Sequence, residues 1–505
     1  MTGLLIRDCV IDGAPSSSVY VEDGTIVNVS KGGELVAPVG CEVIEANGGT
    51  LFPGFTDSHC HPFEYGRLKR SLDLRGTSNV TGVRLRLQAR VQRAKPGEWI
   101  FGRGWNQEDF PDRKTPDHAD IDDVAPSNPV VLLRACGHIA LLNGRAIEEL
   151  RFGSRTGEEF ERDGAGNLTG IVKEGAATEA LAAVPRSPEG CSSDLQAVEA
   201  EAARLGLTTL HCILSSEGYR EELAALAAMD SSHVLSLRYR VYVPLEALDF
   251  SQSSRLEGER VRINGVKLFT DGSLGARTAA LREPYSDEPR TSGILRHTDE
   301  ELSEMVEKVD ARGLQVIIHA IGDRAVEQAI AALSRVTGAK NPRRHRIEHA
   351  GLLPKDLRSK VVRYGIRTTV QPMFVTSDTW AIDRLGEERV RDYYPLRSML
   401  ADGIPTSGGS DSPVESLSPI LGMWAAMTRG GMVPEESVSL PQALTLYTSG
   451  AASNGFDEAS LSEGAPANLT VLDSDVSGMH PALLRKVGVL STVVEGVAVH
   501  SYGAG

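Results

Sequence analysis

Residues 51–61 read Leu51-Phe52-Pro53-Gly54-Phe55-Thr56-Asp57-Ser58-His59-Cys60-His61, a short apolar run that ends in two histidines. The apolar part predicts a buried β-strand. His59 and His61 are two positions apart, so on a strand both imidazoles point to the same side of the sheet. Two neighbouring imidazoles can hold one metal ion, although such a pair can also be an ordinary core or surface pair. The stretch therefore predicts a strand end that carries two ligands of a metal site.

Seven more buried strands are predicted downstream, and most are separated by helical stretches. The strands are expected at residues 207–214, 236–244, 265–269, 314–319, 344–349, 365–371 and 404–409. The helices are expected at residues 195–205, 222–229, 299–311, 325–335 and 355–364. Together with the strand before His59, this alternation is typical of an α/β fold of the (β/α)8 TIM-barrel type.

Both ends of the chain and one long interval depart from this alternation. Residues 1–54 and 455–505 contain short apolar runs with Asp-Gly and Glu-Gly turns, which predict one β-sandwich built from both termini. The barrel is expected from residues 55–65 and 191–454. Residues 66–190 are too many for one crossover connection, so we predict an inserted α+β subdomain near the barrel mouth, with an irregular excursion as the alternative.

The composition limits the classes of function. The 505-residue chain has 53 Lys and Arg against 68 Asp and Glu, and a net charge of −15 argues against nucleic acid or an anionic membrane as partner. Six scattered cysteines lack a CxxC pair, which fits a reducing cytoplasm rather than a disulfide framework or a thiolate zinc site. No run approaches the ~20 apolar residues of a membrane span, and we expect no secretion signal.

Four further metal-capable residues lie on or just after predicted strands. They are Lys267 on the fourth strand, His319 and His349 at the ends of the fifth and sixth, and Asp411 after the eighth. Barrel enzymes build their sites at the carboxyl ends of the strands, so these side chains are expected on one rim with His59 and His61. Nitrogen and oxygen donors of this kind suit Zn²⁺, with Fe, Mn, Ni or Co as alternatives.

Each of these residues also has an ordinary explanation, as a packed histidine, a turn aspartate or a lysine that reaches from a strand to solvent. Lys267, however, lies between Val266 and Leu268 and is expected to face the barrel interior if Phe269 and Asp271 do. A buried lysine readily loses its proton. The neutral amine can then take up CO₂ to form a carbamate, which would bridge two metal ions.

Five ordered motifs resemble the amidohydrolase superfamily and, within it, the YtcJ-like or "amidohydrolase 3" branch. They are FPGFTDSH (52–59), KLFTDGSLG (267–275), HAIGDRA (319–325), RHRIEHA (344–350) and GSDSPV (409–414). The resemblance runs from about residue 4 to residue 501. It implies a (β/α)8 barrel with a β-sandwich and a metal-dependent hydrolase. The implied site consists of metal-binding His59, His61, His319 and His349, a carbamylated Lys267 as bridge, and Asp411 as the proton-handling carboxylate.

The leading hypothesis is hydrolysis of a small-molecule amide, such as an N-substituted formamide. One or two divalent metals, most simply Zn²⁺, would activate water, with Asp411 as general base and also a metal ligand. One alternative is cyclic amidase or deaminase chemistry, and another is a non-catalytic metal-binding barrel. A homodimer is the default expectation for a symmetric soluble enzyme.

The residues expected around the substrate follow from their places after strands or in the insertion. They are Trp105 and His138 in the insertion, Arg277 after the fourth strand, and Phe374, with Gln371 and Met373, after the seventh. Ordinary packing is the alternative for each. Asp323 and Glu348 flank ligand histidines, and one or both are expected to orient the ligands or to support the local fold. Salt bridges with Arg324 or Arg346 are the alternative.

Overall fold

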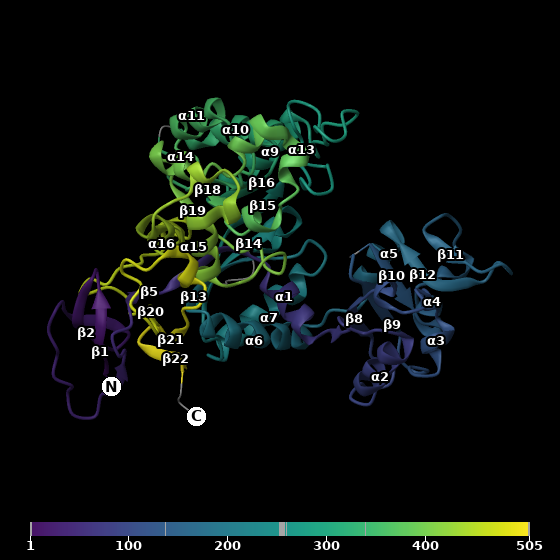
Figure 1. The fold of residues 1–505 in the computed structure, drawn as a ribbon, viewed down its shortest axis with the longest axis horizontal. Coiled ribbons are helices and arrows are strands. Elements are labelled where there is room, and N and C mark those ends of the chain that lie inside the picture. Colours follow the sequence, from purple (N-terminus) through teal and green to yellow (C-terminus); the bar gives the residue numbers. More distant parts are fainter. Residues whose placement is uncertain (1–2, 137, 252–257, 259, 339, 503–505) are drawn as a thin grey trace. The chain divides into compact units, whose positions relative to one another are not determined.

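The structure is a computed structural model that describes residues 3–136, 138–251, 258, 260–338 and 340–502 (Figure 1). The chain divides into two compact units. Unit 1 comprises residues 1–66 and 192–505, and unit 2 comprises residues 67–191. The predicted insertion of residues 66–190 has nearly the same bounds as unit 2. The barrel and the sheets of both chain ends lie together in unit 1.

Eight parallel strands form the central sheet of unit 1. In order along the sheet they are β19 (Thr406–Gly408), β18 (Arg367–Val370), β17 (Arg346–His349), β16 (Gln315–Ala320), β15 (Val261–Phe269), β14 (Arg238–Pro244), β13 (Leu207–Ile213) and β6 (Phe55–Cys60). Backbone bonds nearly close the sheet: the Asp411 N–H donates to the His59 carbonyl at 2.7 Å, and the His61 N–H to the Ser412 carbonyl at 2.8 Å. The predicted barrel is therefore confirmed as a nearly closed, eight-stranded parallel barrel.

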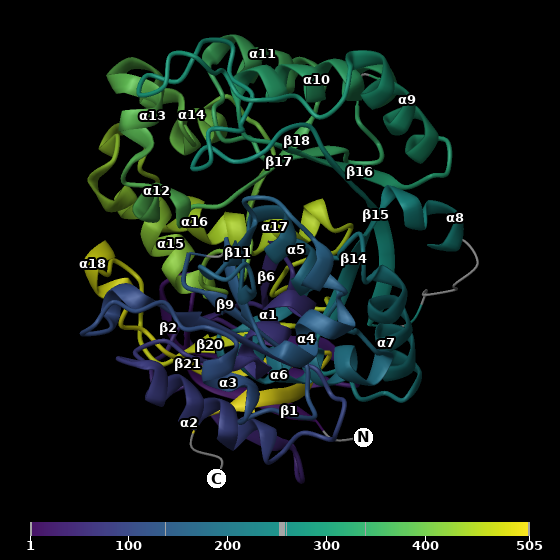
Figure 2. The same ribbon diagram turned by 90° about the vertical axis from the view of Figure 1, so that its right-hand side faces the viewer.

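Helices lie outside the barrel strands, as Figure 2 shows for α9, α10 and α11. Their bounds are α6 (Pro188–Arg204), α7 (Tyr219–Ser231), α9 (Asp299–Asp310), α10 (Asp323–Thr337) and α11 (Lys355–Arg363). α9 begins at a capping box formed by Thr298 and Glu301, which satisfies backbone N–H groups of its first turn. Within the described ranges, no helix is both long and apolar enough to cross a membrane.

Two four-stranded sheets complete unit 1. The first is β3 (Thr25–Ser30), β2 (Ala14–Glu22), β1 (Leu4–Ile11) and β4 (Glu42–Glu45), and the second is β22 (Val497–Ser501), β21 (Val489–Val494), β20 (Leu469–Leu472) and β5 (Leu51–Pro53). Buried Ile6 and Val19 of the first sheet share one apolar cluster with Leu469 and Val471 of the second. Because β5 pairs with β20, the strand that leads into β6 is tied to the C-terminal segment.

Unit 2 is built on one six-stranded mixed sheet. Its order is β11 (Phe160–Arg162), β12 (Leu168–Lys173), β10 (Ile139–Leu142), β9 (Val130–Arg134), β8 (Ile100–Trp105) and β7 (Leu72–Asp73). The neighbouring residues Val130 and Val131 belong to two different apolar clusters, so both faces of the sheet are buried. α2 (Val80–Val91) packs on one face and α5 (Glu174–Ala182) on the other (Figure 1).

Candidate metal centre

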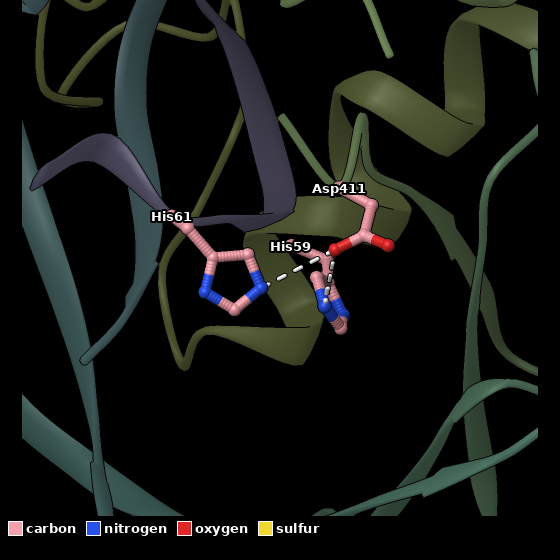
Figure 3. A group of neighbouring side chains, drawn as sticks. All are labelled: His59, His61 and Asp411. Atoms are coloured by element: carbon pink, nitrogen blue, oxygen red, sulfur yellow. Dashed lines mark ion pairs between the residues drawn. The ribbon is translucent and has the colours of Figure 1, made fainter. Parts of the chain in front are cut away.

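Three side chains at the carboxyl ends of the first and last strands of the barrel, or just after them, meet in one place (Figure 3). One carboxylate oxygen of Asp411 lies 3.2 Å from Nε2 of His59 and 3.3 Å from Nε2 of His61. The three potential ligand atoms all lie within 4.8 Å of one another. The backbone bonds between β6 and the segment after β19 cause this meeting, because they place Asp411 directly beside the two histidines.

His319 and His349 join the same cluster from β16 and β17. The ring centroids of His59 and His349 are 4.9 Å apart, and those of His349 and His319 are 4.5 Å apart. His59 and His61 are 5.6 Å apart by the same measure. The structure thus brings all four sequence-predicted histidines together as a row of neighbouring rings.

Three of these histidines have one ring nitrogen beside an oxygen acceptor. The pairs are His349 Nδ1 with Gln371 Oε1 (2.8 Å), His319 Nε2 with the Gly272 carbonyl (3.0 Å), and His59 Nδ1 with the Glu348 carboxylate. An oxygen acceptor favours the proton on the nitrogen that faces it. The opposite nitrogen then keeps its lone pair for a cation, which is the usual way in which neighbouring groups orient metal-binding histidines.

Glu348 is held in turn by Arg346 on the same strand. The Arg346 guanidinium donates to Glu348, to the Ser58 carbonyl at 3.0 Å and to the Tyr242 hydroxyl at 3.1 Å. Both charged side chains are fully buried. Burial would raise the pKa of Glu348, but the Arg346 guanidinium and the contact with the His59 ring lower it well below its ordinary value, so the carboxylate stays ionised. Glu348 therefore orients His59 and pairs with Arg346 at the same time.

Loss of the Arg346 guanidinium is expected to destabilise the barrel strongly. Arg346→Met would leave the Glu348 carboxylate buried without its cation, which typically costs about 3–5 kcal/mol of unfolding free energy. Adding Glu348→Leu to Arg346→Met should recover part of that loss, because the uncompensated charge is then gone. Urea denaturation followed by circular dichroism measures both values.

The control for Arg346 is Arg335→Met. Arg335 pairs with Glu307 at 3.5 Å on the surface of unit 1, with both side chains more than half exposed. Exposed pairs contribute about 0–1 kcal/mol, so this variant should unfold almost like the wild type. An Arg346→Met protein no less stable than Arg335→Met would show that the buried ion pair does not have the proposed importance.

Lys267 is buried beside this cluster. Its Nζ lies 5.1 Å from the centroid of the Phe269 ring, and that ring lies 5.4 Å from the ring of His319. Burial lowers the pKa of Lys267 to about 8, although the carboxylates of Glu348 and Asp411 act in the opposite direction. A measurable share of the side chain is therefore a neutral amine near neutral pH.

The protonation states of Asp411 and His349 fit a divalent cation. Burial would raise the pKa of Asp411, but His59 and His61 lower it well below its ordinary value, so the carboxylate is ionised. Burial, together with neighbouring His319, lowers the pKa of His349 well below its ordinary value and keeps that imidazole neutral. Neutral imidazoles and ionised carboxylates are the forms that bind Zn²⁺ and similar metals.

Comparison with known proteins places the chain in a family. The model of the amidohydrolase family matches residues 42–500. The chain belongs to the amidohydrolase family. This confirms the resemblance inferred from the five sequence motifs, and the barrel with its rim of histidines is thus the fold of a hydrolase family.

Three relatives of this amidohydrolase align with it over nearly the whole length of both chains. YtcJ of Bacillus subtilis (strain 168) is 33% identical over 525 aligned residues, which cover 99% of this chain and 98% of YtcJ. An N-substituted formamide deformylase of Arthrobacter pascens is 26% identical and covers 95% of this chain and 94% of its own. The crystal structure of an uncharacterized metal-dependent hydrolase from Pyrococcus furiosus is 30% identical with a TM-score of 0.80, and the match covers 94% of this chain and 99% of that one.

The sequence-predicted substrate residues of this amidohydrolase that lie in unit 1 are Arg277, Gln371, Met373 and Phe374. Phe374, the first residue of α12 (Phe374–Ser377), stacks beside His349 with ring centroids 6.2 Å apart and planes inclined by 13°. It gives the histidine cluster an aromatic neighbour. Arg277 lies in the segment after β15, where its guanidinium donates to both carboxylate oxygens of Asp287 at 2.8 and 3.1 Å. The positive charge of Arg277 is therefore paired with a carboxylate of the same loop.

The other two predicted substrate residues lie in unit 2. Trp105 is fully buried in an apolar cluster of that unit, and its indole N–H donates to the Leu132 carbonyl at 2.7 Å. The structure corrects the expectation for Trp105: it packs in a core, since both faces of this sheet are covered. His138 is exposed, with Nδ1 3.2 Å from the carboxylate of Glu174. Its contact with a substrate stays a prediction.

Gln371 and Asp271 help to build the site in ways that the sequence did not reveal. Gln371 was expected to line the pocket, whereas its amide oxygen holds His349. Asp271 accepts backbone N–H groups from Ile321 at 3.1 Å and Gly322 at 2.9 Å, which fixes the turn after β16. The sequence offered the same signal for both residues, which is a polar side chain within two residues of the end of a buried strand.

Asp323, at the start of α10, has a local role. Its carboxylate accepts the backbone N–H groups of Arg282 at 2.8 Å and Arg324 at 3.0 Å. Of the roles expected for Asp323, the structure shows the one in the local fold and not an ion pair with the Arg324 guanidinium. Asp323 anchors the loop after β15 to the start of the helix.

Proposed function

We propose that this amidohydrolase-family protein hydrolyses a carbon–nitrogen bond of the amide type in a small molecule, with a bound divalent metal, most simply Zn²⁺. The observation that carries the proposal is the convergence of His59, His61 and Asp411 within 4.8 Å. The formamide deformylase and the metal-dependent hydrolase among its relatives support the same chemistry. Similarity to the formamide deformylase supports a linear amide, rather than a cyclic one, as the substrate proposed for this chain.

Different residues of the chain would bind the metal, transfer the proton and contact the substrate. His59, His61, His319 and His349, with Asp411, would hold one or two metal ions. Such a cation supplies a Lewis acid that brings the pKa of water toward neutrality and polarises a carbonyl group. Asp411, ionised at neutral pH, accepts the proton of the attacking water and delivers it to the leaving nitrogen. Phe374 offers an apolar face to the acyl or amine part of the substrate.

Lys267 is proposed to take up CO₂ as a carbamate, which would add two oxygen donors to the histidine cluster. Formation of the N–C bond requires the neutral amine and releases one proton. With the pKa lowered to about 8 by burial, the neutral fraction rises as the pH rises through that value. Bicarbonate should therefore restore activity to metal-depleted protein, on addition of metal, more completely at about pH 8.5 than at about pH 7.

The measurement for Lys267 is ¹³C NMR of protein equilibrated with labelled bicarbonate. A carbamate signal is expected in the wild-type protein and not in Lys267→Met. A Lys267→Met protein with the same signal and the same bicarbonate dependence would contradict the assignment.

A panel of substrates tests the function. Linear amides, N-substituted formamides, lactams, exocyclic amines and esters would be assayed with the zinc-loaded protein. Turnover of formamides or other linear amides supports the proposal. Preference for lactams would point to a cyclic amidase, and release of ammonia from exocyclic amines to a deaminase. Turnover of esters alone would overturn the proposal.

A further inference from the structure

An arginine in the segment between β15 and α9 is anchored beside the histidine cluster. The backbone N–H of Arg296 donates to the Thr270 carbonyl at 2.8 Å. Thr270 in turn donates through its hydroxyl to the His319 carbonyl at 2.6 Å. Residue 296 is therefore tied through one intermediate residue to the strand end that carries His319.

The side chain of Arg296 shares an aromatic neighbour with the site. Its guanidinium carbon lies 5.5 Å from the centroid of the Phe269 ring. The same ring lies 5.1 Å from Nζ of Lys267 and 5.4 Å from the ring of His319. Stacking on an aromatic face restricts the guanidinium without using its N–H donors, so they stay available to a ligand.

Arg296 differs from the other arginines of this segment. Three of them have carboxylate partners, in the pairs Arg277 with Asp287, Arg282 with Asp356, and Arg290 with Glu288. Across the described residues, no carboxylate lies within the 4.0 Å of an ion pair from Arg296, and the residue is exposed. In a chain with a net charge of −15, an arginine left unpaired beside the site is free to bind an anion.

We propose that Arg296 binds a carboxylate group of the substrate, so that the preferred substrates are amides that carry a carboxylate, such as N-formyl or N-acyl amino acids. The planar fork of a guanidinium matches the two oxygens of a carboxylate. The inference rests on the proposed function only for the amide part. It makes Arg296 a specificity-determining residue, outside the groups that carry out proton transfer.

Matched substrate pairs test the role of Arg296. Each pair consists of an N-formyl or N-acetyl amino acid, in both enantiomers, and the corresponding amino alcohol, which lacks only the carboxylate. The wild-type protein should have a lower KM for the acid by about tenfold or more. Arg296→Met should raise that KM by about 10- to 100-fold with little change in kcat, and leave the alcohols unaffected. Arg296→Lys should lie between the two.

The matched control is Arg290→Met. Arg290 lies in the same segment and is 88% exposed, but it pairs with Glu288 at 2.8 Å. This variant should keep the wild-type KM for both members of every pair. A loss equal to that of Arg296→Met would indicate a general effect of positive charge and would overturn the assignment.

A binding measurement separates this inference from the proposed function. Calorimetric titration of the same acids and alcohols into the protein needs no turnover. Preferential binding of the acid that disappears in Arg296→Met supports a carboxylate site even if no amide is hydrolysed, which would refute only the proposed function. Equal affinity for acids and alcohols, no binding of either, or unchanged preference in Arg296→Met would overturn the carboxylate site.

Discussion

Asp411→Asn is expected to lower kcat by about 10³-fold or more with the fold unchanged. The carboxylate of Asp411 lies 3.2 and 3.3 Å from the ring nitrogens of His59 and His61, and its lowered pKa keeps it ionised, so in the proposed reaction it accepts the proton. Removal of a positioned general base costs about 10²- to 10⁴-fold. Asparagine is nearly isosteric but cannot accept the proton, and its uncharged oxygen is also a weaker metal ligand.

Steady-state kinetics on the amide found in the substrate panel would measure this effect, with metal content determined on the same samples. Asp383→Asn, an exposed aspartate in α13 (Ala381–Arg389), is the control and should keep full activity. If Asp411→Asn kept more than a tenth of the wild-type kcat at equal metal content, another group would have to carry the proton.

Removal of the metal is expected to abolish turnover and to lower the thermal stability. After dialysis against a chelator, activity should fall by about 10³-fold or more, because water at its ordinary pKa is a poor nucleophile at pH 7. Zinc in excess should restore it. A ligand that binds only the folded protein at 100 times its Kd adds about 2.7 kcal/mol of stability, so the unfolding temperature should rise with added metal.

The control for metal removal is the His59→Ala protein. It lacks a central member of the cluster, so added zinc should change neither its activity nor its unfolding temperature to the wild-type extent. Activity that survives complete metal removal, shown by elemental analysis, would contradict metal-dependent hydrolysis.

The barrel and the residues on its rim could be predicted because they depend on local pattern. Buried parallel strands form apolar runs, and chemistry-bearing residues at their ends are forced onto one rim by the topology. His59, His319 and His349 each end such a run or lie one residue from its end, and the structure brings them together. No knowledge of side-chain contacts was needed for this step.

Contacts that depend on tertiary packing could not be predicted in the same way. β15 begins at Val261, four residues before the predicted start. The prediction started too late because polar Arg262 and Asn264 interrupt the apolar run. In the structure, both side chains donate to the Gly455 carbonyl. Trp105 resembled a pocket residue, but a sheet covered on both faces buries it. The contact of Gln371 with His349 depends on a rotamer that a sequence pattern does not encode. For Glu348, the sequence offered either contact with a histidine or pairing with Arg346, and the structure shows both.

The joining of β6 to the segment after β19 also affects biosynthesis. The ribosome adds about 5–20 residues per second, so the histidines of β6 emerge on the order of tens of seconds before Asp411. During that interval the nascent chain contains His59 and His61 but not yet Asp411, whose carboxylate lies beside them in the folded protein. In the proposed mechanism, loading with metal therefore waits until translation has passed residue 411 and the ends of the barrel have joined. Chains terminated earlier should lack activity, however well their upstream strands had folded.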